Sequence, residues 1–144
     1  MRRGFTIMEL LIVIGILAAL GLFSVPVFQN FSQSNDLQVA FNLITNSIIG
    51  AQIKSQSVVN DSVWGVKIIG HEVVIFKGNN YAGRDPAFDE KAGFSSNITI
   101  NPAFEIFFNK LSLYPIATFS NITITNSLNE AKTFSINERG VVIY

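Results

Sequence analysis

The stretch "RRGFTIMELLIVIGILAALGLF", residues 2–23, places a single carboxylate, Glu9, at the start of an apolar run. Residues 10–35 include no charged side chain, and Leu10–Phe23 includes no polar one. About 20 mostly apolar residues are enough to cross the core of a bilayer as a helix. The stretch therefore predicts a transmembrane helix at residues 5–28.

The basic residues indicate an orientation for that helix. Arg2 and Arg3 precede the apolar run, and no basic residue follows until Lys54. Because basic residues favour the cytoplasmic side, we expect a single-pass protein with a cytoplasmic N-terminus. Residues 57–144 are then expected on the opposite side of the membrane.

Two simpler interpretations of the N-terminus stay open. A secretory signal peptide would explain the basic start, and Ala19-Leu20-Gly21 is a small-x-small cleavage triplet. The apolar run nevertheless continues beyond that triplet, to Phe28. A plain single-pass anchor is the second alternative, and neither of the two explains Glu9.

Glu9 favours a third interpretation. An ionisable side chain in a membrane helix costs about 2.5–3.5 kcal/mol at the helix centre, so it usually has a partner. A cut after Gly4 would create a new α-amine on Phe5, four residues from Glu9. The amine of one copy and the carboxylate of the next would then neutralise each other when the helices assemble.

The segment "RRG|FTIMELLIVIGILAALGLFSVP" resembles the class III signal of type IV pilins and type II secretion pseudopilins. Gly4 matches the residue before the cut, Phe5 the new N-terminus and Glu9 the pilin glutamate, which implies a role of Glu9 in filament assembly. Pro26 falls where many pilins have a helix-kinking proline. The resemblance covers about a sixth of the chain.

The resemblance implies how the protein matures and where it resides. Residues 1–4 would be a leader peptide, which prepilin peptidase removes between Gly4 and Phe5 before it N-methylates Phe5. The precursor would lie in the bacterial cytoplasmic (inner) membrane, with a periplasmic or extracellular C-terminal domain. Its partners would be the membrane, other pilin or pseudopilin subunits, and the secretion or pilus assembly machinery.

Residues 29–56 are predicted to continue the helix with amphipathic character. Apolar side chains recur every three or four residues among Asn, Gln, Ser and Thr, at Leu37, Phe41, Ile44, Ile48 and Ala51. We expect one helix over residues 5–56, kinked at Pro26 because proline removes a backbone hydrogen bond.

Residues 57–144 read as a β-rich globular domain. Short runs of branched and aromatic residues predict a hairpin turning at Gly70-His71 and five later strands, the last two joined by a turn at residues 137–140. Residues 79–96, "NNYAGRDPAFDEKAGFSS", read as a polar loop. The expected fold class is α+β: a pilin-like roll, with the long N-terminal helix packed on an antiparallel sheet.

Three further segments are similar to H-type minor pseudopilins and related minor pilins of type IV pili: "VNDSVWGVKI", "VVIFKG" and "FSINERGVVIY". Those proteins usually have a central glycine after a Phe-rich strand. Here "FFNKLSLYP" supplies the phenylalanines and a proline without that glycine.

Residues that could support catalysis or bind cofactors are sparse. The chain has no cysteine and one histidine, His71, so thiolate and multi-histidine metal sites are excluded. A calcium site at Asp85, Asp89 and Glu90 stays open because oxygen ligands are present. A solvated loop is the alternative, and we predict no enzyme activity, no cofactor and no metal.

DNA binding is also considered for the C-terminal part. Lys132 and Arg139 are the only basic residues after Lys110, and Glu130 and Glu138 lie beside them. Since binding to phosphates scales with the charge neutralised, little DNA binding is expected.

The sequence thus predicts a structural subunit, of minor type, of a type II secretion pseudopilus or a type IV pilus. It would assemble through its N-terminal helix. The alternatives are a membrane-anchored extracytoplasmic binding domain and a minor pilin that binds DNA for uptake. The choice between secretion, pilus and DNA-uptake systems, and the cargo, stay open.

Overall fold

The computed structural model describes residues 4–117 and 119–143, leaving aside the side chains of residues 22–28. In that part the chain forms helix α1 (Ile7–Gln56), a short 3₁₀ helix η1 (Val59–Asp61) and eight β-strands in two antiparallel sheets. The predicted α+β class is confirmed. The chain divides into two compact units, Met1–Ser32 and Gln33–Tyr144.

The predicted membrane span must be corrected. Within the described residues, no helix combines the length and the apolar character that a membrane crossing needs. The run without any polar side chain, Leu10–Phe23, has 14 residues, fewer than the about 20 that a bilayer core requires. The transmembrane segment at residues 5–28 and the placement in the cytoplasmic membrane were therefore wrong predictions.

The second half of α1 buries the predicted apolar stripe. Leu37, Phe41, Ile44, Ile48 and Ala51 are all buried, together with Ala40, Ser47 and Ser55. Their spacing of three or four residues places them along one face of the helix, so that face packs on the domain.

The end of α1 is set by backbone geometry. The Ser57 N–H donates to the Ile53 carbonyl at 2.9 Å, and Val58 then adopts a left-handed conformation, with φ 51°. A left-handed residue cannot continue a right-handed helix, so it ends α1 at Gln56, as predicted.

The first sheet has the strand order β3-β2-β1-β5. Its members are β1 (Trp64–Ile69), β2 (Glu72–Lys77), β3 (Asp85–Gly93) and β5 (Glu105–Phe108). The predicted β1–β2 hairpin is confirmed, with Ile69 paired to Glu72. Gly70 has φ 57°, a left-handed conformation that glycine adopts at no steric cost.

The second sheet has the order β4-β6-β7-β8. Its members are β4 (Thr99–Asn101), β6 (Phe119–Thr125), β7 (Ala131–Ile136) and β8 (Val142–Ile143). The predicted turn between β7 and β8 is confirmed: the Asn137 side-chain oxygen accepts from the Arg139 and Val141 N–H groups, both at 2.9 Å.

Residues 79–96 are only partly the loop that the sequence predicts, because nine of them form β3. This strand pairs with β2 at the edge of its sheet, with Val73 opposite Ala92 and Ile75 opposite Glu90. An edge strand has one partner and one solvated side, so it accepts the charged residues that masked its strand character in the sequence.

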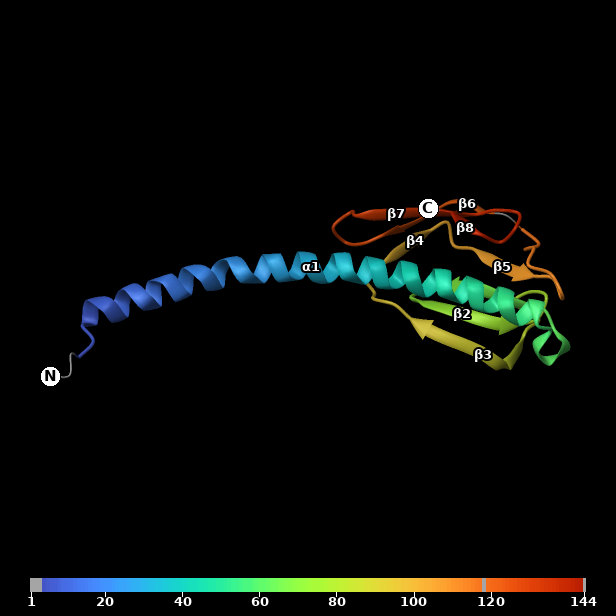
Figure 1. The fold of residues 1–144 in the computed structure, drawn as a ribbon, viewed down its shortest axis with the longest axis horizontal. Helices are drawn as coiled ribbons and strands as arrows, with labels where there is room; N and C mark the ends of the chain where they lie inside the picture. The colour runs from blue at the N-terminus through green and yellow to red at the C-terminus, as the bar shows by residue number, and fades with distance from the viewer. Residues whose placement is uncertain (1–3, 118, 144) are drawn as a thin grey trace. The chain divides into compact units, whose positions relative to one another are not determined.

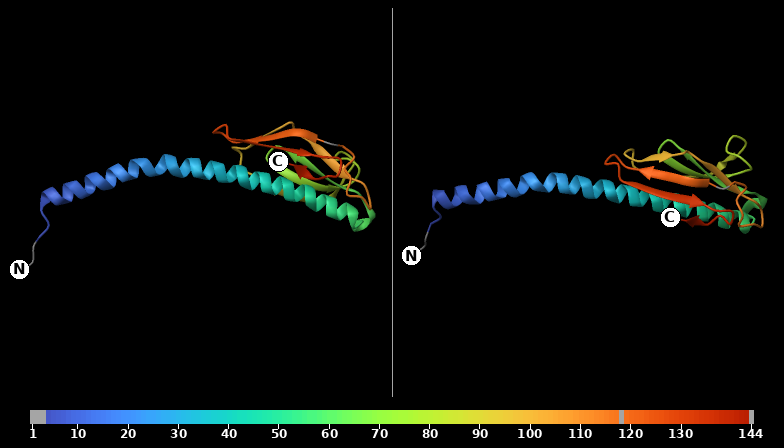
Figure 2. Two further views of the ribbon diagram at one scale, coloured as in Figure 1. Left: turned by 45° about the horizontal axis from the view of Figure 1, so that its top comes forward. Right: turned by 90° about the horizontal axis from the view of Figure 1, so that it is seen from above.

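Both sheets lie on one side of the second half of α1, as Figures 1 and 2 show. The core forms between the buried face of that helix segment and the two sheets. Its fully buried large side chains include Trp64, Phe108, Phe134 and Ile44. The predicted single sheet is thus two sheets, which share one core.

Candidate functional site

The predicted cleavage site lies just before α1 and is accessible. Gly4 is exposed, and a Cβ added there would have no heavy atom within 4 Å. Phe5 is 78% exposed. Both residues precede Ile7, where α1 begins, so the bond between them lies in non-helical chain that an active site could accommodate.

Thr6 caps the first turn of α1. Its side-chain oxygen accepts from the Glu9 N–H at 3.2 Å, and its carbonyl accepts from the Leu10 N–H at 3.2 Å. The spacing Thr6-x-x-Glu9 is that of a capping box, in which the cap residue satisfies a free N–H of the first turn. Sequence reasoning missed this role, although the pattern was visible in the residues.

Glu9 has a second reason to lie in the first turn. The positive end of the helix macrodipole is at the N-terminus, where a carboxylate is stabilising. Among the described residues, Glu9 forms no ion pair. Its side chain is exposed, so the carboxylate is open to a partner outside this chain.

Apolar side chains follow Glu9 on every face of the helix. Successive residues of a helix are rotated by about 100°, so five consecutive residues sample its whole circumference. The residues of Leu10–Ile14 are all 43–62% exposed. Further exposed apolar side chains are Ile7 (81%), Met8 (70%), Ile16 (55%), Leu17 (63%) and Leu20 (63%).

We call the exposed apolar residues of Ile7–Leu20 the apolar helix surface. Monomeric proteins rarely expose contiguous apolar patches of more than a few hundred Å², and larger ones mark interaction sites. Within Met1–Ser32, no described residue reaches the buried class. The apolar helix surface is therefore exposed to intermolecular contact. The predicted kink at Pro26 lies outside the residues whose side chains are described.

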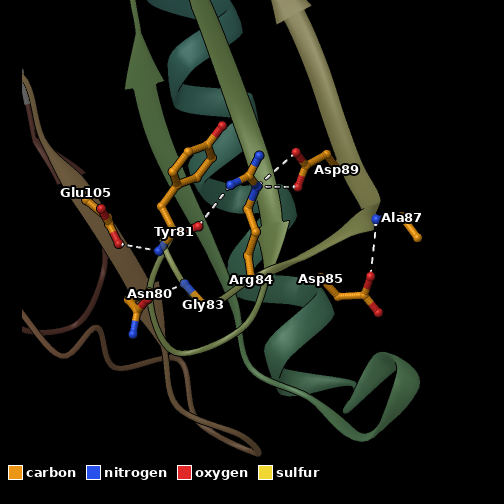
Figure 3. A network of polar contacts seen from close by, with 8 residues as sticks. All are labelled: Asn80, Tyr81, Gly83, Arg84, Asp85, Ala87, Asp89 and Glu105. Atoms are coloured by element: carbon orange, nitrogen blue, oxygen red, sulfur yellow. Dashed lines mark hydrogen bonds and ion pairs between the residues drawn. The ribbon is translucent and has the colours of Figure 1, made fainter.

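The carboxylates at 85–90 have partners within the protein. Figure 3 shows the Asp89 carboxylate facing the Arg84 guanidinium, with both oxygens 2.9 Å from Nε. Glu90 pairs with Lys54 of α1, and the Asp85 carboxylate accepts from the Ala87 N–H at 3.2 Å. The carboxylates considered for calcium thus have partners in the protein itself.

Metal ligands are not clustered in the described residues: no three or more His, Asp or Glu side chains come together there. His71 is exposed, and its ring lies edge-on to Phe94, with centroids 6.1 Å apart. His71 is thus a surface residue.

The two C-terminal basic residues do not lie together on one element. Lys132 belongs to β7, where its ammonium contacts the Gln38 side-chain oxygen and lies 5.3 Å from the Phe41 ring centroid. Arg139 lies in the turn between β7 and β8.

Comparison with known proteins finds no family model, curated protein or solved structure that matches this chain.

Proposed function

We propose that this protein is a structural subunit of a type IV pilin-like filament. The filament would be a type II secretion pseudopilus or a type IV pilus, and the subunit would be of minor type. In this proposal its α+β domain is a variant of the pilin roll. The subunit assembles with sister subunits through the first half of α1.

The single observation that carries the proposal is the apolar helix surface. Removing apolar surface from water is favourable by about 25 cal/mol per Å². Side chains exposed on every face can be covered only by several neighbours at once, not by one groove. A bundle of parallel sister helices provides such surroundings, and a helical filament repeats them along its axis.

Glu9 provides the register of that assembly in our proposal. A charge inside an apolar bundle is costly unless an opposite charge meets it. The α-amine of a mature Phe5 is the partner that the resemblance indicates. Because Thr6 caps the first turn of α1, the position of Glu9 on its own helix is fixed, and the amine of a neighbouring subunit meets it there.

Cleavage between Gly4 and Phe5 by prepilin peptidase, followed by methylation of Phe5, would create this partner. The exposed, non-helical position of Gly4 and Phe5 supports access for the peptidase. Mass spectrometry of the N-terminal peptide from cells tests this step. A peptide that starts at N-methylated Phe5 is expected, whereas an intact Met1 or a start at Leu22 would rule the proposal out.

Assembly itself is tested with Glu9→Gln, which keeps the shape of the side chain and removes its charge. We expect normal cleavage but loss of most of the variant from sheared or cross-linked filaments. Glu72→Gln, which neutralises an exposed carboxylate in β2, is the matched control and should assemble normally. Equal incorporation of both variants would refute the role given to Glu9.

A further inference from the structure

A pocket of about 530 Å³ opens near the C-terminal end of α1. Three segments distant in sequence supply its walls: the last turns of α1, the loop between β5 and β6, and the turn before β8. Its lining includes Gln56, Leu111, Leu113, Tyr114, Arg139 and Val141. The volume lies in the range typical of ligand sites.

Hydrogen bonds from α1 hold the pocket walls in place. The Gln52 amide donates to the Leu113 carbonyl at 2.8 Å and to the Arg139 carbonyl at 3.3 Å. The Leu111 N–H donates to the Ser55 carbonyl at 3.2 Å. One helix therefore fixes both the loop and the turn, so the pocket is formed before any ligand arrives.

Leu111 lies at this pocket in a strained and exposed state. Its φ is 58°, a left-handed conformation that leucine rarely adopts, and its side chain is 79% exposed. Strain of this kind costs about 1–3 kcal/mol and clusters at functional sites. The strained backbone thus keeps an apolar side chain exposed to water, which indicates a ligand with an apolar group.

Among the described residues that line the pocket, Arg139 is the only charged one. Throughout the described residues, its guanidinium forms no ion pair and donates no hydrogen bond. By contrast, Lys54, Lys67, Arg84 and Lys110 all pair with carboxylates. The pocket thus combines apolar side chains and uncharged polar ones with one positive charge that no described carboxylate pairs.

We propose that this pocket binds the C-terminal residue of an apolar peptide segment from a partner protein. Arg139 receives the terminal carboxylate, and Leu111, Leu113 and Val141 contact the last side chain. Guanidinium groups bind carboxylates through paired, charge-assisted hydrogen bonds. A C-terminal residue fits this pocket because its carboxylate and its side chain are attached to the same Cα and can reach Arg139 and the leucines together.

The surroundings favour a peptide over a small molecule. Two further exposed apolar side chains lie within two residues of the pocket lining in the sequence. They are Ile116 and Ile143, both 52% exposed. A peptide that leaves the pocket could cover them. This inference does not depend on the filament proposal, because every residue involved belongs to Gln33–Tyr144.

The test uses the full chain and the fluorescein-labelled peptide Gly-Ser-Gly-Ser-Ala-Leu-Ile-Leu, with fluorescence anisotropy as the readout. We expect saturable binding of the free acid and about tenfold weaker binding of its C-terminal amide, since the amide removes the charge-assisted bonds. Arg139→Gln should weaken binding of the free acid to the same extent.

Two variants of the neighbouring loop complete the design. Leu111→Asn introduces a residue that tolerates positive φ, so the fold should persist while the apolar contact and peptide affinity are lost. Lys110→Gln removes a nearby cation that pairs with Asp61 and does not line the pocket, so affinity should not change.

Several outcomes would overturn the proposal. These are absence of binding, equal binding of acid and amide, and an equal loss with Lys110→Gln, which would indicate unspecific attraction. An Arg139-dependent affinity for a single-stranded oligonucleotide in place of the peptide would assign the pocket to nucleic acid instead.

Discussion

At the scale of single residues, some charged side chains of the domain hold a loop on the strands. The segment between β2 and β3 shows this best: the Glu105 carboxylate accepts from the Tyr81 N–H at 2.7 Å, and the Lys67 ammonium lies 2.9 Å from Glu105. The Arg84 guanidinium stacks 3.6 Å from the centroid of the Tyr81 ring (Figure 3). The loop is thereby tied to both β1 and β5.

The Arg84–Asp89 pair is the most buried of these contacts, with side chains 18% and 5% exposed. Removal of one partner from a buried pair leaves an uncompensated charge. Asp89→Asn should therefore lower the free energy of unfolding by about 3 kcal/mol, measured by urea denaturation.

Asp61→Asn is the control for that experiment. Asp61 also pairs with a cation, Lys110, but its side chain is 91% exposed. Exposed pairs contribute little, so this variant should unfold at nearly the same urea concentration as the unmodified protein. Similar losses for Asp61→Asn and Asp89→Asn would show that burial does not decide the strength of these pairs.

Thr6 offers a second prediction at this scale. Thr6→Ala removes the acceptor of the Glu9 N–H and should destabilise the first turn of α1 by about 1 kcal/mol. Amide hydrogen exchange at Glu9 should become roughly five times faster by that estimate, because the turn opens more often. Thr6→Ser retains the hydroxyl and should restore slow exchange; equally fast exchange in both variants would argue against capping.

At the scale of elements, α1 is one helix with two different surroundings. From Leu37 to Ala51 one of its faces is buried against the sheets. From Ile7 to Gly21 all of its described side chains are exposed. The periodic spacing of apolar residues separates the two parts, because a helix that packs on one side needs an apolar stripe and one covered on all sides needs apolar residues throughout.

Two isoleucines of α1 test this distinction. Ile44 is fully buried, whereas Ile49 is 43% exposed. Ile44→Ala should lower the free energy of unfolding by about 2–5 kcal/mol through lost contacts and a cavity. Ile49→Ala should have a much smaller effect, which thermal or urea unfolding of the two variants would measure. Equal losses of unfolding free energy in the two variants would show that the buried face of α1 does not contribute to the core.

Among the strands, predictability follows the hydrophobic pattern. β1 and β2 are runs of branched and aromatic residues around a glycine turn, so local chemistry specifies them. β3 reads Asp-Pro-Ala-Phe-Asp-Glu-Lys-Ala-Gly, and only pairing with β2 makes it a strand. Tertiary pairing can override a weak local preference in this way.

At the scale of the whole molecule, the core is confined to one part of the chain. Every buried residue that the structure describes lies at Leu37 or later, and the charged network of Figure 3 lies there too. The stability of the domain and the exposure of the apolar helix surface are therefore separate properties of this chain.

A truncated chain of residues 33–144 tests that separation. It should unfold cooperatively in urea, because it contains all the described buried residues. It should also sediment as a monomer, whereas the full chain should self-associate through the apolar helix surface. A truncated chain that unfolds without a cooperative transition, or that associates as strongly as the full chain, would contradict this view.

The sequence by itself determined those features that local chemistry specifies: the apolar run after Glu9, the buried stripe of α1 and the end of the helix at Gln56, the β1–β2 hairpin, and the turn before β8. Only the tertiary structure decided what depends on distant partners. The division of the strands into two sheets, the recruitment of β3, and the convergence of Arg139 with Leu111 on one pocket belong to this group. The physical reason is range: hydrophobic period and turn chemistry act within a few residues, whereas strand pairing and pockets join segments that only the folded chain brings together.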